Sequence, residues 1–165
     1  MKNITINEIG LCISESLRAG KKNVLFISHT LQYENVLTWA DEHPEYYLCR
    51  ETPSPLYNQT ESGRLIKDEN CMIIANATLE NANSENSIWF LHAFSEKCIN
   101  NFDGFLDIIK NRFYVNKFSD GTVQKISLEK LPLFVAFTSN PDENDWASLD
   151  EKYYALFDEI YLVNE

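Results

Sequence analysis

The sequence predicts a single α/β domain, a three-layer sandwich in which a mostly parallel sheet lies between helices. Continuous apolar runs at residues 24–27, 88–91 and 133–138 are typical of strands buried on both faces of a parallel sheet. Segments with helical periodicity alternate with these runs, as the crossover connections of parallel strands require. The chain has 165 residues, 44% of them hydrophobic, which is enough to bury a substantial core. We therefore expect one domain over residues 1–165.

The first half of the chain contains two predicted helices. In residues 7–18 the apolar side chains recur on one helical face, and Gly20 can end that helix. A second helix is expected over residues 32–42, because Pro44 prevents its continuation. The other segments expected here are strands over 23–28 and 46–49, a long loop over 50–70 and a short hairpin around 65–74.

The second half of the chain contains a predicted β-hairpin. Asp120 and Gly121 form an Asp-Gly pair between two β-rich segments, and both residue types tolerate the positive φ angles of a tight turn. Ser148 is a candidate N-cap for a helix near the end of the chain. The segments expected here are strands over 87–94, 112–117, 122–128, 133–138 and 159–163 and helices over 102–110 and 148–156.

The charge of the chain favours basic partners. Lys and Arg number 14 against 25 Asp and Glu, so the net charge is -11. Such a chain repels phosphate backbones and anionic lipid, so we expect neither direct nucleic-acid binding nor membrane contact. Lys117 and Lys125 flank the predicted hairpin, but with Asp120 between them we expect a solvated hairpin. Without a signal-like or membrane-spanning stretch, the expected location is cytoplasmic.

The four cysteines give no sign of a metal site or a disulfide framework. They are widely scattered and form no C-x-x-C pair. We therefore interpret them as buried, reduced thiols and expect no cofactor at these positions. The residues concerned are Cys12, Cys49, Cys71 and Cys98.

Two C-terminal motifs carry a family resemblance. Residues 134–141 (FVAFTSNP) are similar to the strand of AAA+ ATPases that ends in T-x-N-P, which makes Asn140 the counterpart of the sensor asparagine. Residues 149–158 resemble the segment that ends in an arginine, Phe and Asp before the last strand, with Leu156 in the arginine position. The order of elements resembles the branch that includes MoxR-like ATPases, the McrB GTPase and dynein-type modules. The resemblance implies a P-loop NTPase fold.

The resemblance places a phosphate-binding loop directly after the first buried strand, at residues 28–35. The pattern G-x-x-x-x-G-K-[ST] needs glycines for close backbone approach to phosphate and a lysine to neutralise it. Ser28 and Tyr33 stand at the glycine positions, Glu34 at the lysine and Asn35 at the hydroxyl that would bind Mg²⁺. Because Glu34 repels a triphosphate and Tyr33 blocks backbone approach, we expect no nucleotide cofactor.

The resemblance also places two carboxylates after the second buried strand, where this chain has His92 and Ala93. Ala93 cannot polarise water, and imidazole is a poor ligand for the hard cation Mg²⁺. Glu96 is the alternative as a displaced carboxylate. Of the family's chemical residues only Asn140 is present, and the family's helical lid is not expected in this chain.

Other residues are candidates for a metal site or a hydrolase site, and each has an alternative structural interpretation. His29, His92 and Glu34 all follow buried strands and could bind a transition metal, or could simply fill the space of a vacated nucleotide pocket. Ser28, His29 and Ser139 could suggest a hydrolase, but no G-x-S-x-G motif is present. His43, beside Pro44, is expected in a solvated loop.

Acidic patches occur at residues 142–145 and 150–151. They are either solvated loops or a surface that mimics a nucleic-acid backbone or docks on a basic subunit. Trp146, next to the first patch, is either an interface anchor or a core residue.

These patterns favour a non-catalytic AAA+-like module, a pseudo-ATPase that binds a protein partner, either an active AAA+ subunit or another copy of itself. The alternatives are a divergent nucleotide-binding ATPase that uses Asn140, and an acidic inhibitor or nucleic-acid mimic.

Overall fold

Six parallel strands form the central sheet of the computed structural model, in the order β1-β10-β2-β9-β6-β3. The α/β class with a parallel sheet is therefore confirmed. Each neighbouring pair is non-consecutive in the chain, which is why crossover connections lie on the faces of the sheet. The strands are β1 (Lys2–Thr5), β2 (Asn23–Ile27), β3 (Tyr47–Cys49), β6 (Ser87–Leu91), β9 (Leu133–Thr138) and β10 (Glu159–Asn164).

The structure describes most, but not all, of the chain. The described residues are 1–29, 33–50, 57–59, 65–67, 82–96, 99, 105–117, 121, 123–139 and 148–164. Within this part of the chain, no helix is long and apolar enough to cross a membrane.

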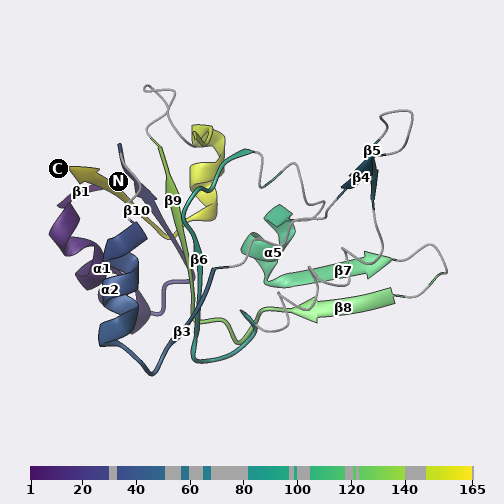
Figure 1. Ribbon diagram of the computed structural model, residues 1–165, viewed down its shortest axis with the longest axis horizontal. Coiled ribbons are helices and arrows are strands. Elements are labelled where there is room, and N and C mark those ends of the chain that lie inside the picture. The colour runs from purple at the N-terminus through teal and green to yellow at the C-terminus, as the bar shows by residue number, and fades with distance from the viewer. Residues whose placement is uncertain are drawn as a thin grey trace.

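Helices cover both faces of the sheet, which gives the three layers that the sequence predicts (Figure 1). One face is covered by α1 (Ile9–Arg18), which follows a short 3-10 helix η1 (Ile6–Glu8), and by α2 (Tyr33–Glu42). The other face is covered by α5 (Phe105–Asn111) and by the 3-10 helix η3 (Glu151–Leu156).

The side chains of each central strand alternate between two cores, as expected of strands buried on both faces. In β2, Val24 and Phe26 lie in the core under α1 and α2, whereas Leu25 and Ile27 lie in the core under α5. All five residues of β2 are buried. The continuous apolar runs of the sequence are therefore the parts of the sheet that face helices on both sides.

Aromatic rings cross the centre of the sheet on the face of α1 and α2. The Phe26 ring stacks on Phe137 of β9 at 4.8 Å between centroids and on Tyr161 of β10 at 5.2 Å. Phe90 of β6 meets Phe137 edge-on at 5.7 Å. Tyr161, Phe26 and Phe137 are direct partners across three strands, and Phe90, which is opposite Val135, reaches Phe137 diagonally. The row therefore helps to align four neighbouring strands.

Two antiparallel hairpins lie outside the main sheet. The predicted Asp-Gly hairpin is confirmed as β7 (Phe113–Lys117) and β8 (Val123–Ser127), with Gly121 at a φ of 86°. The second hairpin consists of β4 (Tyr57–Gln59) and β5 (Leu65–Lys67), so it starts earlier than the sequence suggested.

Two predictions about the chain ends are wrong. Ser148 does not cap a helix, because it forms a parallel bridge with Ser139. The helix that follows is the 3-10 helix η3, and Asp150 caps it by accepting a hydrogen bond from the Lys152 N–H at 2.9 Å. Strand β1 was not predicted, and it pairs with β10 at the edge of the sheet.

The described cysteines agree with the prediction that the thiols are buried. Cys12 and Cys49 are buried, and burial raises the pKa of the Cys12 thiol. Cys71 and Cys98 lie outside the described residues.

Arg112 joins α5 to β7 and is the one non-glycine residue with a positive φ, 56°, among those described. Its side chain is buried, and its Nη2 donates to the Lys22 carbonyl at 2.6 Å, which ties the hairpin to the start of β2. Nε and Nη1 have no hydrogen-bond partner, and burial lowers the pKa of Arg112 to about 10. Arg112 therefore destabilises the folded state in two ways: its backbone has a positive φ, and its buried guanidinium has lost contact with water.

Replacing Arg112 by Gly or by Ala separates these two costs. Both variants lose the bond to the Lys22 carbonyl, but only Ala keeps a Cβ atom at a φ of 56°. We expect Arg112→Gly to be more stable than Arg112→Ala by about 1 kcal/mol in urea unfolding. Equal stability of the two variants would contradict backbone strain at this position.

Glu159 connects the edge strand β1 to the body of the sheet. Its carboxylate accepts from Lys2 Nζ at 2.7 Å and lies 3.3 Å from Lys21 Nζ. The hydrogen bond from Lys2 is the largest cause of the lowered pKa of Glu159. The folded state therefore holds the Glu159 proton less tightly than the unfolded state does, so this stabilisation is present at neutral pH.

The substitution Glu159→Gln tests this ion pair through its pH dependence. Near neutral pH we expect a loss of roughly 0.5 kcal/mol in the free energy of unfolding, because the pair is partly exposed. The difference from the unmodified chain should disappear as the pH falls below the ordinary glutamate pKa of about 4.3 and through the lowered folded value. Urea unfolding over this pH range measures it, with the exposed Glu129→Gln as the matched control.

Candidate functional site

The candidate site is the end of the sheet where the carboxyl ends of β2 and β9 lie side by side. The two strands are parallel neighbours, with Ile27 opposite Thr138 at their ends. From β2 the chain continues to α2 on one face of the sheet, and from β9 it continues to η3 on the other face (Figure 1). Strands whose connections diverge in this way form the topological switch point at which open α/β sheets bind ligands.

The end of β2 offers little to an anion. Ser28 is buried, and its backbone N–H donates to the Thr138 carbonyl at 3.0 Å, so the β2-β9 ladder continues past the strand. This N–H is therefore already engaged and does not face a phosphate. His29, which follows, is half-buried.

The N-terminus of α2 lies after this strand end and carries negative charge. Glu34 is exposed in the first turn of the helix, and Asn35 beside it is half-buried. A helix N-terminus attracts anions through its free N–H groups and its dipole, and Glu34 places a carboxylate in the first turn, where a second anion would be repelled. Tyr33 begins the helix, and its side chain lies outside the described residues.

The end of β6, two strands from β2, carries no carboxylate directly after the strand. His92 is exposed and Ala93 is half-buried. Phe94 then turns into the core, where its backbone N–H donates to the Phe137 carbonyl at 2.8 Å and its ring contacts Phe134 and Phe157. This turn fixes the chain after β6 against β9.

Glu96 belongs to a surface ion network that sequence reasoning missed. Its carboxylate lies 3.3 Å from Lys152 Nζ, which also lies 3.2 Å from Asp150. The hydrogen bonds to Asp150 and Glu96 raise the pKa of Lys152, and the Lys152 N–H lowers the pKa of Asp150. Glu96 is thus paired with a cation, which argues against its use as a displaced catalytic carboxylate. The N-cap at Asp150 is a local feature that could have been predicted from the sequence, whereas the long-range contact between Glu96 and Lys152 could not.

Leu156, which the resemblance to AAA+ ATPases placed at their arginine position as an expectation, lies at the opposite end of β2 from Ser28. Its carbonyl accepts from Asn23 Nδ2 at 2.8 Å, and Asn23 is the first residue of β2, whereas Ser28 follows the last. Leu156 also packs against the core under η3. Leu156 and Ser28 of the same molecule therefore lie at opposite ends of β2 and do not form one site. Asn140, the acidic patch at 142–145 and Trp146 lie outside the described residues.

The described side chains give no support to a metal site or a hydrolase. Within the described ranges, no group of three His, Cys, Asp or Glu side chains could hold a metal ion, and these ranges include His29, His92 and Glu34. Ser139 is buried in the bridge to Ser148.

Comparison with known proteins gives no relative: no protein-family model matches the chain, and no curated protein matches it.

Proposed function

We propose that this chain is a non-catalytic protein-interaction module, a pseudo-ATPase with an AAA+-like P-loop NTPase core that acts through a protein partner or through another copy of itself. The resemblance puts a phosphate loop after β2 and a sensor asparagine after β9. These strands are neighbours and end side by side, which supports the proposal because both features would meet at one end of the sheet.

The observation that carries the proposal is the charge at this site. Nucleotide chemistry needs a cation after β2 and carboxylates after β6. Here the exposed Glu34 occupies the first turn of α2, and β6 is followed by His92 and Ala93. The charge required at each position is reversed or missing, so both triphosphate binding and activation of water are disfavoured.

The setting that fits this proposal is cytoplasmic, with a protein as the partner. The four cysteines are widely scattered and form no C-x-x-C pair, which fits reduced thiols in a reducing compartment. A net charge of -11 favours basic protein surfaces over nucleic acid or anionic membranes.

Titration calorimetry with ATP or GTP in the presence of Mg²⁺ tests the absence of nucleotide chemistry. We expect no saturable binding to the folded chain and no phosphate release above a blank. Binding with a micromolar Kd would overturn the proposal and favour the divergent ATPase. Circular dichroism on the same sample establishes that the chain is folded.

The substitution Glu34→Lys tests whether the charge at residue 34 alone accounts for the expected absence of ATP binding. It restores a cation to the first turn of α2, but β6 would still be followed by His92 and Ala93. We expect this variant to remain without micromolar ATP affinity in the same calorimetric titration, and the neutral Glu34→Gln serves as its control. A gain of micromolar binding in Glu34→Lys alone would mean that the site is otherwise competent.

A further inference from the structure

The hairpin of β7 and β8 has an outer face that is unusually apolar. Its inner face contributes Ile126 to the core, so Lys125, the neighbour of Ile126 in β8, and Val115, opposite Lys125 in β7, point outward. Phe113, Val115 and Val123 on the outer face are 41%, 36% and 51% exposed. The solvent face of an antiparallel ribbon is normally polar, and clustered exposed apolar side chains mark interaction surfaces.

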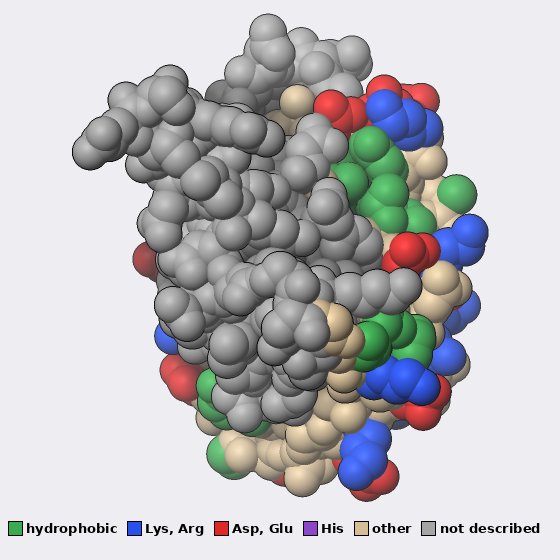
Figure 2. All heavy atoms as spheres, turned by 90° about the vertical axis from the view of Figure 1, so that its right-hand side faces the viewer, with side chains coloured by type: hydrophobic (Ala, Val, Ile, Leu, Met, Phe, Trp, Pro, Cys, Tyr) green, Lys and Arg blue, Asp and Glu red, His purple; other side chains and the backbone are tan. Residues whose placement is uncertain are grey.

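The outer hairpin face is also cationic on an acidic chain. Lys117 and Lys125 are the only charged residues in the two strands, and Lys125 is exposed opposite Val115. Figure 2, which views the molecule from the side of this hairpin, shows exposed hydrophobic side chains beside Lys and Arg side chains. The chain as a whole has a net charge of -11, so the exposed Lys125 is a cation on an acidic chain. The best match of the outer hairpin face is an acidic surface with apolar contacts.

The end of α2 supplies an acidic surface on the other side of the molecule (Figure 1). Residues 33–49 contain no Lys or Arg, and Asp41, Glu42 and Glu45 are exposed. The last turn of α2 has no basic residue, so Asp41 and Glu42 add negative charge where the helix dipole is already negative. A cation from outside would be favourable here.

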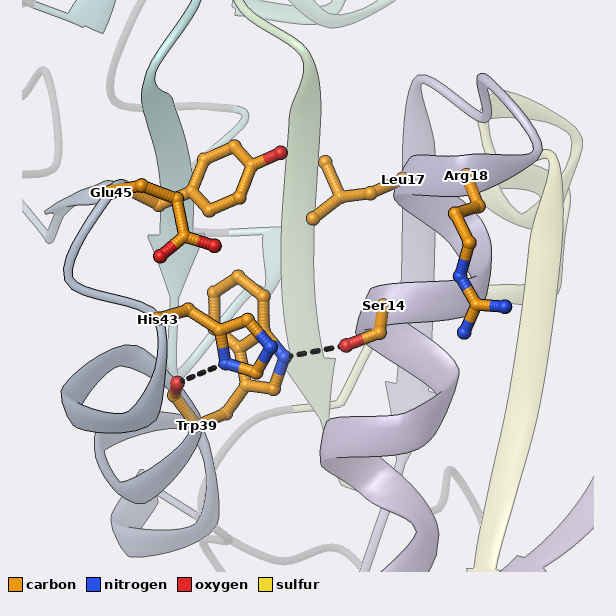
Figure 3. A pocket seen from close by; sticks show the side chains of 7 residues that line it. Ser14, Leu17, Arg18, Trp39, His43 and Glu45 are labelled. Atoms are coloured by element: carbon orange, nitrogen blue, oxygen red, sulfur yellow. Dashed lines mark hydrogen bonds between the residues drawn. The ribbon is translucent and has the colours of Figure 1, made fainter.

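A groove beside this acidic end can receive apolar side chains. It lies between α1 and α2, has a volume of about 270 Å³, and is lined by Leu17, Trp39, Tyr46 and Glu45 among others (Figure 3). Tyr47, next along the chain, is 60% exposed. The groove thus joins aromatic and aliphatic walls to the carboxylate of Glu45, and Arg18 of α1 also lines it. The negative charge offered to the outer hairpin face is therefore that of Glu45 together with the exposed Asp41 and Glu42.

The floor of the groove is held in place before any partner binds. Trp39 Nε1 donates to Ser14 Oγ at 2.9 Å, and the His43 ring stacks on Trp39 at 4.4 Å between centroids. His43 Nδ1 donates to the Trp39 carbonyl at 2.8 Å, so the expectation of a solvated His43 is wrong. Side chains that are already ordered lose little entropy on binding, which favours association.

We infer that the outer hairpin face of one copy docks against the acidic end of α2 and the α1-α2 groove of a second copy. This rests on the proposed function and specifies its self-associating form. The two surfaces lie on opposite sides of the molecule (Figure 1), so one copy cannot use both of them against the same partner. The contact is therefore head-to-tail and continues into a ring or a filament rather than closing as a two-fold dimer. The hairpin face is only about 17 Å long, and standard interfaces bury about 800 Å² per partner, so association is weak.

Sedimentation velocity over a wide concentration range tests the inference through a charge swap. We expect the unmodified chain to form species larger than a dimer at high concentration. Lys125→Glu and Glu45→Lys should each weaken association by roughly tenfold, and the two variants mixed should associate with each other again. Lys130→Glu, an exposed lysine outside the hairpin, makes the same charge change and should leave association unchanged.

The apolar part of the contact is tested by Val115→Thr combined with Val123→Thr. Threonine keeps the β-branched shape that the strands favour, so the hairpin should form while the outer face becomes polar. We expect weaker association at an unchanged thermal midpoint. A chain that stays monomeric at every concentration, or association that none of these hairpin variants alters, overturns the inference. Neither result bears on nucleotide binding, so the failure of this contact is distinguishable from failure of the pseudo-ATPase proposal.

Discussion

The stacking of Phe26 between Phe137 and Tyr161 is the contact on which the arrangement of this molecule depends, because it aligns β2 with both neighbours at once. The start of β2 is fixed as well. Asn23 Nδ2 donates to carbonyls of Ile109 and Leu156, and Asp158 accepts from the Lys22 and Asn23 N–H groups. With both its core and its start fixed, β2 ends between β9 and β10, and its end beside β9 is the candidate site.

The sequence predicted the elements that are buried on both faces and missed those at the edges. Residues 24–27, 88–91 and 133–138 are continuous apolar runs because helices cover both sides of those strands. Strand β1 gave no such signal, since only Ile4 is buried and its neighbours are exposed. Ser148 was a plausible cap by type, but its backbone is used in the bridge to Ser139, a long-range contact that no local pattern reveals.

The candidate site was predictable as a set of strand ends but not as a set of contacts. Parallel strands end at one edge, so the proximity of the segments after β2, β9 and β6 followed from their order. The pairing of Glu96 with Lys152 joins segments that lie far apart in the sequence and depends on where η3 packs. The separation of Leu156 from Ser28 likewise required knowing that η3 ends near the start of β2.

The stability of this fold and the chemistry at its strand ends depend on different residues. Buried side chains such as Phe26, Trp89 and Phe134 supply most of the hydrophobic free energy, whereas the exposed Glu34 and His92 contribute little to it. A scaffold of this kind can change the residues at its strand ends without loss of fold. Val115 and Val123 differ from both groups: they are exposed apolar residues, so they contribute little to the core and leave apolar surface in water. A contact that covers them is the physical reason for apolar residues there, which makes the hairpin more informative about function than the candidate site.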